Sequence, residues 1–407
     1  ESQKFASSSY SSDLYVCWPN NKEDKNLNQI LVSSSSLVDF PLWDRMKEKN
    51  RVLAFSLELT ARCNNNCSHC YINLPADDLA AKEKELNYEE IMKIADQAIE
   101  MGALWCTITG GEPLLRNDFK EIYLGLKRKG LIVSVFTNAT LIKEEHIELF
   151  KKYPPRDIEV TVYGVTSETY EAVTRRPGSF KAFIHGLNLL LQSGIKVRLK
   201  AMVIRSNFKE LPQIAKFCRE RTKDYFLFDP LLHLRYDRNS ARNKEIKSER
   251  LTPQEIVAIE MADIDKLRLL EKACDKLKNF ENSNLASGKI FTCGTGIGSF
   301  DICFDGSMRL CTTLGHPHCV YNLRKGSLAD AWQNFVPKIR DMRSSKEEFL
   351  TTCRICPIRS LCGWCPATAH LETGELDSWT EYFCQVAHER AKALGYENNK
   401  DFLDFKK

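Results

Sequence analysis

Between about Val52 and Pro230 the sequence alternates short β-rich runs with segments of helical period, which restricts the chain to a few folds. The expected strands lie at 52–60, 104–109, 131–137, 157–163, 196–203 and 225–229. The expected helices lie at 87–101, 117–129, 143–152, 179–193 and 208–222. Strands separated by helices predict parallel βαβ units, which form a doubly wound sheet or a full or partial barrel. In each of these folds, ligands bind beyond the carboxyl ends of the strands.

Basic and acidic residues nearly balance, with 58 Lys and Arg against 54 Asp and Glu and a formal net charge of +4. So small an excess predicts neither a nucleic-acid surface nor a polybasic membrane surface. No uninterrupted apolar run is long enough to span a bilayer. The first residues, ESQKFASSSYSS, lack the charged-then-apolar pattern of a secretory signal. We therefore expect a cytoplasmic protein that binds neither nucleic acid nor membrane.

The 16 cysteines are many for a chain without such a signal, and they are clustered. Ten lie between Cys274 and Cys384, and three more fall within the eight residues from Cys63 to Cys70. Multi-thiolate metal sites require such clustering, whereas a disulfide framework does not. The scattered cysteines lie on apolar patterns typical of buried thiols: Cys17, Cys106, Cys218 and Cys274.

The first cluster, Cys63, Cys67 and Cys70, has the spacing C-x3-C-x2-C in a loop after the first expected strand. Three thiolates at this spacing can hold one iron–sulfur cubane and leave its fourth iron open to an exogenous group. The competing interpretation is a zinc knuckle with His69 as a further ligand. The next expected strand is followed by Gly110-Gly111-Glu112-Pro113, in which the glycines allow close backbone approach to a ligand and Glu112 can accept from an ammonium group.

Together these two motifs, with Tyr71 directly after the third cysteine, resemble the radical S-adenosylmethionine (SAM) superfamily over roughly residues 52–230. The resemblance implies a partial (β/α)6 TIM-like barrel in an α/β fold. It also implies a [4Fe–4S] cluster on the three cysteines, whose open iron binds the amino and carboxylate groups of SAM. The residues implied to contact SAM are Tyr71, Gly110, Gly111, Glu112, Pro113, Thr137, Asn138 and Thr161, with Arg175 or Arg176. A plain surface arginine pair is the alternative for the last two.

A second cysteine array spans 293–384. Cys293 is followed by twelve residues, Gly306, four residues and Cys311, and the rest reads Cys353-x2-Cys356-x5-Cys362-x2-Cys365-x18-Cys384. Two zinc ribbons would separate their CxxC pairs by about 15 to 20 residues, but here the gap is five. Seven thiolates fit two iron–sulfur clusters better.

This array resembles the SPASM extension of radical SAM enzymes, which implies two auxiliary clusters, expected as [4Fe–4S]. By the resemblance, the distal cluster is held by Cys353, Cys356, Cys362 and Cys384, and the proximal one by Cys293, Cys311 and Cys365. The chain departs from the family pattern in having two residues, not three, before Cys365. The fourth proximal ligand stays open between Cys303, an exogenous thiolate and Cys319.

The expected domain organisation is an N-terminal extension at 1–50, the radical SAM barrel at 51–230, a helical linker at 231–288, the SPASM domain at 289–390 and a tail at 391–407. The roughly 50 residues before the barrel are too few for a leader-binding domain, so either leader recognition is expected on a separate protein or the substrate is a small molecule.

The resemblance implies a peptide maturase that cleaves SAM reductively to a 5′-deoxyadenosyl radical and modifies a peptide or protein side chain by crosslinking, thioether formation or epimerisation. Such an oxidoreductase needs an external one-electron donor such as flavodoxin or ferredoxin. Sulfatase-maturing members carry Asp after the ligand that matches Cys311, and Thr312 stands there instead. One alternative is radical oxidation or rearrangement of a small metabolite. Another is an iron–sulfur protein for electron transfer or redox sensing, although such a carrier needs no SAM pocket.

Overall fold

The computed structural model describes residues 51–223, 226–278 and 288–396. The expected N-terminal extension, 1–50, and residues 397–407 of the expected tail lie outside the described residues.

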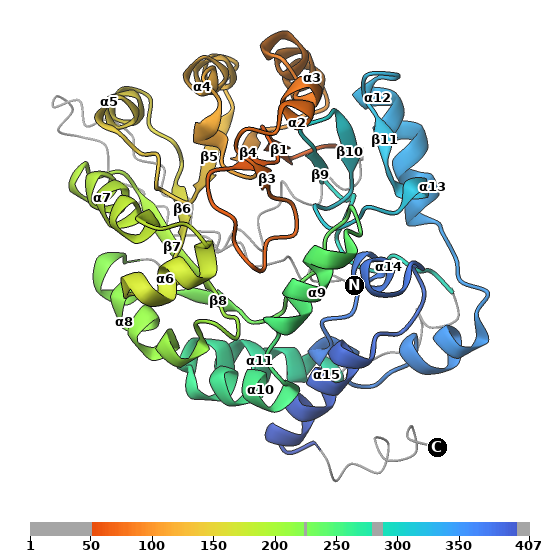
Figure 1. The fold of residues 1–407 in the computed structure, drawn as a ribbon. Helices are drawn as coiled ribbons and strands as arrows, with labels where there is room; N and C mark the ends of the chain where they lie inside the picture. Colours follow the sequence, from red (N-terminus) through yellow and green to blue (C-terminus); the bar gives the residue numbers. More distant parts are fainter. Residues whose placement is uncertain (1–50, 224–225, 279–287, 397–407) are drawn as a thin grey trace, which may run out of the picture.

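Six parallel strands, separated by helices, follow one another across a curved sheet (Figure 1). The strands are β1 (Ala54–Glu58), β4 (Trp105–Thr109), β5 (Ile132–Thr137), β6 (Ile158–Thr161), β7 (Val197–Met202) and β8 (Leu227–Asp229). The helices expected between them are α3 (Tyr88–Glu100), α4 (Phe119–Arg128), α5 (Glu144–Lys152), α7 (Ser179–Gln192) and α8 (Leu211–Arg221). They line the convex side of the sheet (Figure 1), so the expected partial (β/α)6 barrel is confirmed.

Several short elements were not expected from the sequence. They are β2 (Arg62–Cys63), β3 (Leu74–Pro75), α2 (Leu79–Lys84) and α6 (Ser167–Thr174). The α6 helix begins where the Thr166 side chain accepts a hydrogen bond from the Thr169 amide. The segment expected as a helical linker forms α9 (Ser240–Ser248), α10 (Pro253–Ala262) and α11 (Ile264–Lys278).

The Cys-rich region contributes three strands to the same sheet, which the sequence did not predict. They are β9 (Ser299–Ile302), β10 (Ser307–Arg309) and β11 (Tyr321–Asn322). β9 pairs in parallel with β1, and β10 runs antiparallel to β9. Phe300 stacks on Phe55 with ring centroids 5.8 Å apart, so the β9–β1 contact is packed as well as hydrogen-bonded.

The rest of this region contains the helices α12 (Leu328–Asp330), α13 (Val336–Arg340), α14 (Pro366–Thr373) and α15 (Glu381–Ala393). Arg390 of α15 forms a buried ion pair with Glu260 of α10 at 2.6 Å and also donates to the Leu361 carbonyl oxygen at 2.8 Å. The buried Arg390–Glu260 ion pair therefore connects the linker helices to the Cys-rich region. Within the described residues, no helix has the length and apolar character needed to cross a membrane.

The two faces of the sheet differ in polarity because side chains alternate along each strand. One set packs into the hydrophobic core, where the covering helices also contribute: Phe55, Leu57, Cys106, Ile108, Val133, Val135, Ile158, Val160, Val197, Leu199, Phe300 and Ile302. The alternate set, which we call the lumen face, is mostly polar, although it also includes Trp105, Ile132, Phe136 and Met202. Its polar members include Ser56, Glu58, Thr107, Thr109, Ser134, Glu159, Thr161, Arg198, Lys200, Asp301 and Arg309. Complete (β/α)8 barrels fill this space with bulky apolar side chains, so a polar lumen is suited to binding a ligand.

Candidate active site

Three cysteine thiols gather in the loop that follows β1. Cys67 is buried, and Cys63 and Cys70 are partly exposed. Burial, followed by the Glu112 carboxylate, raises the pKa of Cys63 to about 12. Burial also raises the pKa of Cys67 well above its usual range, with Cys70 and Cys63 as the neighbouring charges. A bound cation reverses this effect by holding its thiols as thiolates, so the donor set fits a cationic iron cluster.

The zinc-knuckle alternative finds no support at this loop. In the described part of the chain, no three His, Cys, Asp or Glu side chains are grouped so as to hold one metal ion. His69 is buried with its ring 5.2 Å from that of Tyr163, and burial lowers its pKa to about 4. Thiols that surround a multi-iron cluster do not need to converge on one ion.

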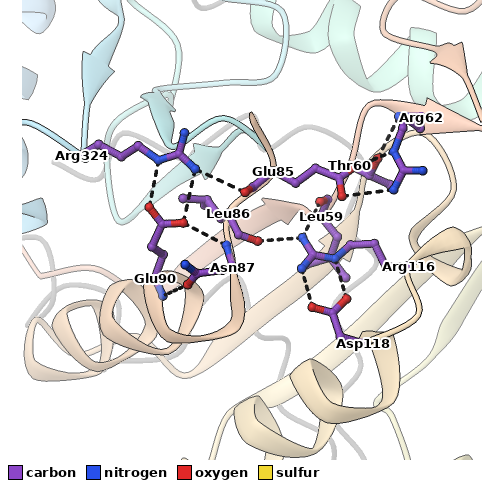
Figure 2. A network of polar contacts seen from close by, with 10 residues as sticks. All are labelled: Leu59, Thr60, Arg62, Glu85, Leu86, Asn87, Glu90, Arg116, Asp118 and Arg324. Atoms are coloured by element: carbon purple, nitrogen blue, oxygen red, sulfur yellow. Dashed lines mark hydrogen bonds and ion pairs between the residues drawn. The ribbon is translucent and has the colours of Figure 1, made fainter. Parts of the chain in front are cut away.

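Arg62 anchors the start of the cysteine loop (Figure 2). Its Nε and Nη2 donate to the two carboxylate oxygens of Glu85 at 2.8 and 3.1 Å, and its Nη1 donates to the Ala76 carbonyl oxygen at 2.9 Å. The Arg62 amide also donates to Thr60 Oγ1 at 2.9 Å. A bidentate, largely buried arginine–carboxylate pair fixes the chain in one orientation immediately before Cys63.

Two elements that the sequence did not reveal as functional hold the rest of this loop. The Asn66 and Ser68 amides donate to carbonyl oxygens at the end of α6, at 2.9 and 3.0 Å. Arg242 of α9 donates through Nη2 to the Cys67 carbonyl oxygen at 2.9 Å. These hydrogen bonds join segments far apart in the sequence, so no local sequence pattern predicts them.

The GGEP segment docks on the chain just before the first cysteine. Gly111 donates its amide to the Thr60 carbonyl oxygen at 2.7 Å, and Glu112 donates to that of Arg62 at 2.9 Å. A Cβ on Gly110 would lie 2.3 Å from Thr60 O, and one on Gly111 would lie 2.3 Å from Arg62 O. The sequence predicted that these glycines let a ligand approach the backbone closely. In the structure, what leaves no room for a side chain at these positions is the protein's own backbone at Thr60 and Arg62.

The Glu112 carboxylate, completely buried, joins the loops after β4 and β5. It accepts hydrogen bonds from Thr137 Oγ1 at 2.8 and 3.0 Å, from the Asn138 amide at 2.8 Å and from the Leu114 amide at 3.0 Å. Pro113 begins the short 3-10 turn that presents the Leu114 amide. Burial raises the pKa of Glu112 to about 7, while these hydrogen bonds lower it.

Asn138 carries this connection to the first cysteine. Its Nδ2 donates to Asn64 Oδ1 at 3.0 Å and lies 3.7 Å from Cys63 Sγ. Its Oδ1 accepts from Thr140 Oγ1 at 2.7 Å, and Thr140 in turn accepts from Asn64 Nδ2 at 2.8 Å. The loops expected to bind SAM therefore share one hydrogen-bond network with the expected cluster ligands.

The structure distinguishes the two arginines that the sequence left in competition. Arg175 forms an ion pair with Glu245 at 2.7 Å, and this pair is partly exposed. Arg176 has a buried Nη1 without a hydrogen-bond partner. The charged neighbours of Tyr170 include Arg176, Cys67 and Glu112. Thr161 lies at the end of β6 on the lumen face. In the strand register it is opposite Lys200 of β7.

In the second cysteine array, Cys353, Cys356, Cys362 and Cys384 are electrostatic neighbours. Burial raises the pKa of Cys353 and of Cys362 to about 12, with the other thiols of this group adding to the effect. Cys293, Cys311 and Cys365 form a second group. Cys293 is an electrostatic neighbour of Cys365, and Asp301 and Cys365 are electrostatic neighbours of Cys311.

The two proposed fourth ligands of the proximal site differ in their surroundings. Burial raises the pKa of both thiols. Cys319 has Cys311 as its charged neighbour. The charged neighbours of Cys303 are Glu58, Arg309, Asp305 and Asp301, with a hydrogen bond to Glu58.

Sequence reasoning also missed two lumen-face residues between the two cysteine regions, Glu58 and Arg309. Tyr71 has Glu58, Cys70 and Asp301 as charged neighbours and a hydrogen bond to Thr312, which follows Cys311. Burial raises the pKa of Glu58 to about 7. Glu58 could have been singled out from the sequence as an acidic residue inside the apolar strand FSLE. Arg309 could not, because its position on the lumen face depends on the pairing of β10 with β9.

The comparisons with known proteins agree with this geometry. Residues 57–218 match the family model described as the Radical SAM superfamily. The subtilosin biosynthesis protein AlbA of Bacillus subtilis is 34% identical over 166 residues, covering 40% of this chain and only 36% of AlbA. An AdoMet-dependent heme synthase of Methanosarcina barkeri is 26% identical over 348 residues, covering 81% of this chain and 95% of the synthase.

Streptococcus suis SuiB, solved with its precursor peptide SuiA, matches the fold with a TM-score of 0.63 over 84% of this chain and 78% of SuiB, at 18% identity. The family match covers the cysteine loop, the GGEP segment and the strands β4 to β7. Residues 57–218 therefore carry a domain of the Radical SAM superfamily.

Proposed function

We propose that this chain is a radical SAM enzyme that modifies a side chain of a peptide or protein. One observation carries the proposal: Cys63, Cys67 and Cys70 gather beside the Glu112-centred loops, where parallel strands end above a polar lumen. This is the edge of a parallel sheet at which ligands bind.

In this proposal, Cys63, Cys67 and Cys70 hold the [4Fe–4S] cluster. A [4Fe–4S] cluster and SAM held there would supply the chemistry of reductive SAM cleavage and hydrogen-atom removal from the substrate, once an external donor had provided one electron. The chain's own task is to position SAM and the substrate and to exclude water. Tyr71, the Gly110–Pro113 loop, Thr137, Asn138 and Thr161 are the proposed SAM contacts. The buried free Nη1 of Arg176 favours it over Arg175 as a further contact.

The second array is proposed to hold two auxiliary iron–sulfur clusters. The mutual proximity of Cys353, Cys356, Cys362 and Cys384 supports the distal site. The neighbourhood of Cys293, Cys311 and Cys365 supports the proximal site. The proximity of Cys319 to Cys311 supports Cys319 over Cys303 as the fourth ligand, and a substrate thiolate at an open position is the alternative.

Two relatives support a peptide substrate. AlbA serves the biosynthesis of the bacteriocin subtilosin, and SuiB binds the precursor peptide SuiA. The second candidate substrate is a small molecule such as a porphyrin, because the heme synthase aligns over nearly its whole length. We also propose a cytoplasmic location, since all described cysteines are free. The proposed electron donor is a flavodoxin or ferredoxin.

The test begins with anaerobic reconstitution of the full chain and an iron count, for which three [4Fe–4S] clusters require about twelve irons. Dithionite and SAM should then yield 5′-deoxyadenosine. Co-expression with short open reading frames near its gene should shift the mass of one encoded peptide by the loss of two hydrogens for a crosslink or thioether. Epimerisation would leave the mass unchanged but exchange one hydrogen with deuterated solvent.

The outcomes separate the candidate functions. Deoxyadenosine with a modified peptide supports the proposal, whereas deoxyadenosine with turnover of an iron porphyrin and no modified peptide supports the small-molecule alternative. Iron without deoxyadenosine supports an electron carrier or redox sensor. Zinc in place of iron contradicts all of these functions.

A further inference from the structure

Two buried side chains of opposite charge lie on the lumen face with polar atoms that have no hydrogen-bond partner. Glu58, at the end of β1, is 2% exposed and has an unpartnered Oε2. Arg309, at the end of β10, is 5% exposed and has unpartnered Nε and Nη1 atoms. Each is an electrostatic neighbour of the other, across the intervening strand β9.

The side chains around this pair are already engaged. Asp301 of β9 is hydrogen-bonded to Ser56, and Cys303 to Glu58. The Tyr236 ring covers the Arg309 guanidinium, 4.3 Å from the ring centroid. Unsatisfied polar atoms of buried charged groups cost free energy, so these atoms are best explained by a ligand that completes them.

The pair lies between the two cysteine regions. Glu58 precedes Cys63 by five residues, and Arg309 precedes Cys311 by two. Tyr71 connects the two sides, because it follows Cys70, has Glu58 as a neighbour and is hydrogen-bonded to Thr312.

We propose that Glu58 and Arg309 form a subsite for a neutral amide group of the substrate, in which Glu58 accepts an N–H and Arg309 donates to a C=O. The inference rests on the proposed function in taking that amide from a peptide. Asp301 and Asp305 add two further carboxyl groups around the single Arg309 guanidinium, and this acidic surrounding favours a neutral amide over an anionic carboxylate.

The test uses the reconstituted full chain with SAM and no reductant. N-acetylglycine methylamide, a minimal neutral peptide group, and N-acetylglycine, its anionic counterpart, are titrated by saturation-transfer NMR. We expect the diamide to bind more tightly than N-acetylglycine. Glu58→Gln and Arg309→Lys should each weaken diamide binding by about tenfold, the loss expected for one hydrogen bond to a charged group.

Glu159→Gln is the matched control, because Glu159 lies on the same lumen face but is already paired with Lys200. Its diamide affinity should stay within about twofold of wild type, a change of less than half a kcal/mol. Iron content and far-UV circular dichroism verify the fold of each variant. If Arg309→Lys misfolds, the near-isosteric Glu58→Gln still decides the question.

The proposal is overturned if wild type does not bind the diamide, if Glu58→Gln binds it as wild type does, or if N-acetylglycine binds more tightly. The same preparations, once reduced, report deoxyadenosine separately. Diamide binding without SAM cleavage would therefore support the subsite while contradicting the proposed function, and cleavage without diamide binding would do the reverse.

Discussion

Thr137 Oγ1 lies 2.8 and 3.0 Å from the two carboxylate oxygens of Glu112, and this contact joins the end of β5 to the loop after β4. Both residues are buried, so water cannot replace the hydroxyl. Glu112 in turn holds the Asn138 amide, and the Asn138 side chain reaches Cys63. The geometry of the proposed cluster site therefore depends on side chains far from the cysteines in sequence.

Thr137→Val removes the hydroxyl while keeping the shape of the side chain. We expect a loss of about 1–3 kcal/mol in the free energy of unfolding, because a buried carboxylate loses a donor. Thr137→Ser keeps the hydroxyl and should recover most of this loss. Denaturant unfolding of both variants checks the expectation, and equal stability of Thr137→Val and wild type would count against the bridge.

Gly111→Ala should disrupt the first cluster site. Its Cβ would lie 2.3 Å from the Arg62 carbonyl oxygen, so the GGEP loop would have to move away from the segment before Cys63. We expect reconstituted protein to lose about four irons, one cluster's worth. Gly130→Ala is the control, since Gly130 has φ +85° and open space around its Cβ position and should cost only about 1–2 kcal/mol of strain. Full iron content in Gly111→Ala would refute this role.

The two arginines after α6 should differ in their effect on SAM binding. Arg176→Met removes the buried, unpartnered donor and should weaken SAM binding by about ten- to a hundredfold. Arg175→Met breaks only the partly exposed pair with Glu245 and should change it by less than about twofold. Equilibrium dialysis with labelled SAM measures both. A larger effect for Arg175→Met would reverse the assignment.

Cysteine variants of the second array should separate ligands from bystanders. Cys365→Ala should lower the iron count by about four, whereas Cys303→Ala should leave it unchanged. The reason is that Cys303 is surrounded by Glu58, Arg309, Asp305 and Asp301. Iron analysis of both reconstituted proteins is the measurement, and iron loss in Cys303→Ala would restore it as a ligand.

The barrel strands were predictable because their pattern is local. β5 was expected at 131–137 and runs Ile132–Thr137, since alternation and flanking turns mark a strand without knowledge of its partners. β9 was not recognised as part of the barrel sheet, because its pairing with β1 joins segments more than 200 residues apart. Short α6 escaped notice for lack of a long periodic pattern.

The candidate site was predictable to the extent that motifs carry it. The cysteine spacing and GGEP identified the loops, but not what holds them. The tethers from Arg242 to the Cys67 carbonyl and from Arg62 to Glu85 join distant segments. The polar atoms of Glu58 and Arg309 that lack hydrogen-bond partners could not be predicted from the sequence, because they come together only when β1, β9 and β10 lie side by side in the sheet.

The central claim is that Cys63, Cys67 and Cys70 hold the cluster that cleaves SAM. The most direct measurement compares 5′-deoxyadenosine formation, under dithionite and SAM, by wild type and by the variant with all three cysteines changed to alanine. We predict deoxyadenosine from wild type, and none from the variant, which should keep about eight irons on its auxiliary sites. Equal deoxyadenosine formation by the two proteins, or none by iron-replete wild type, would contradict the account.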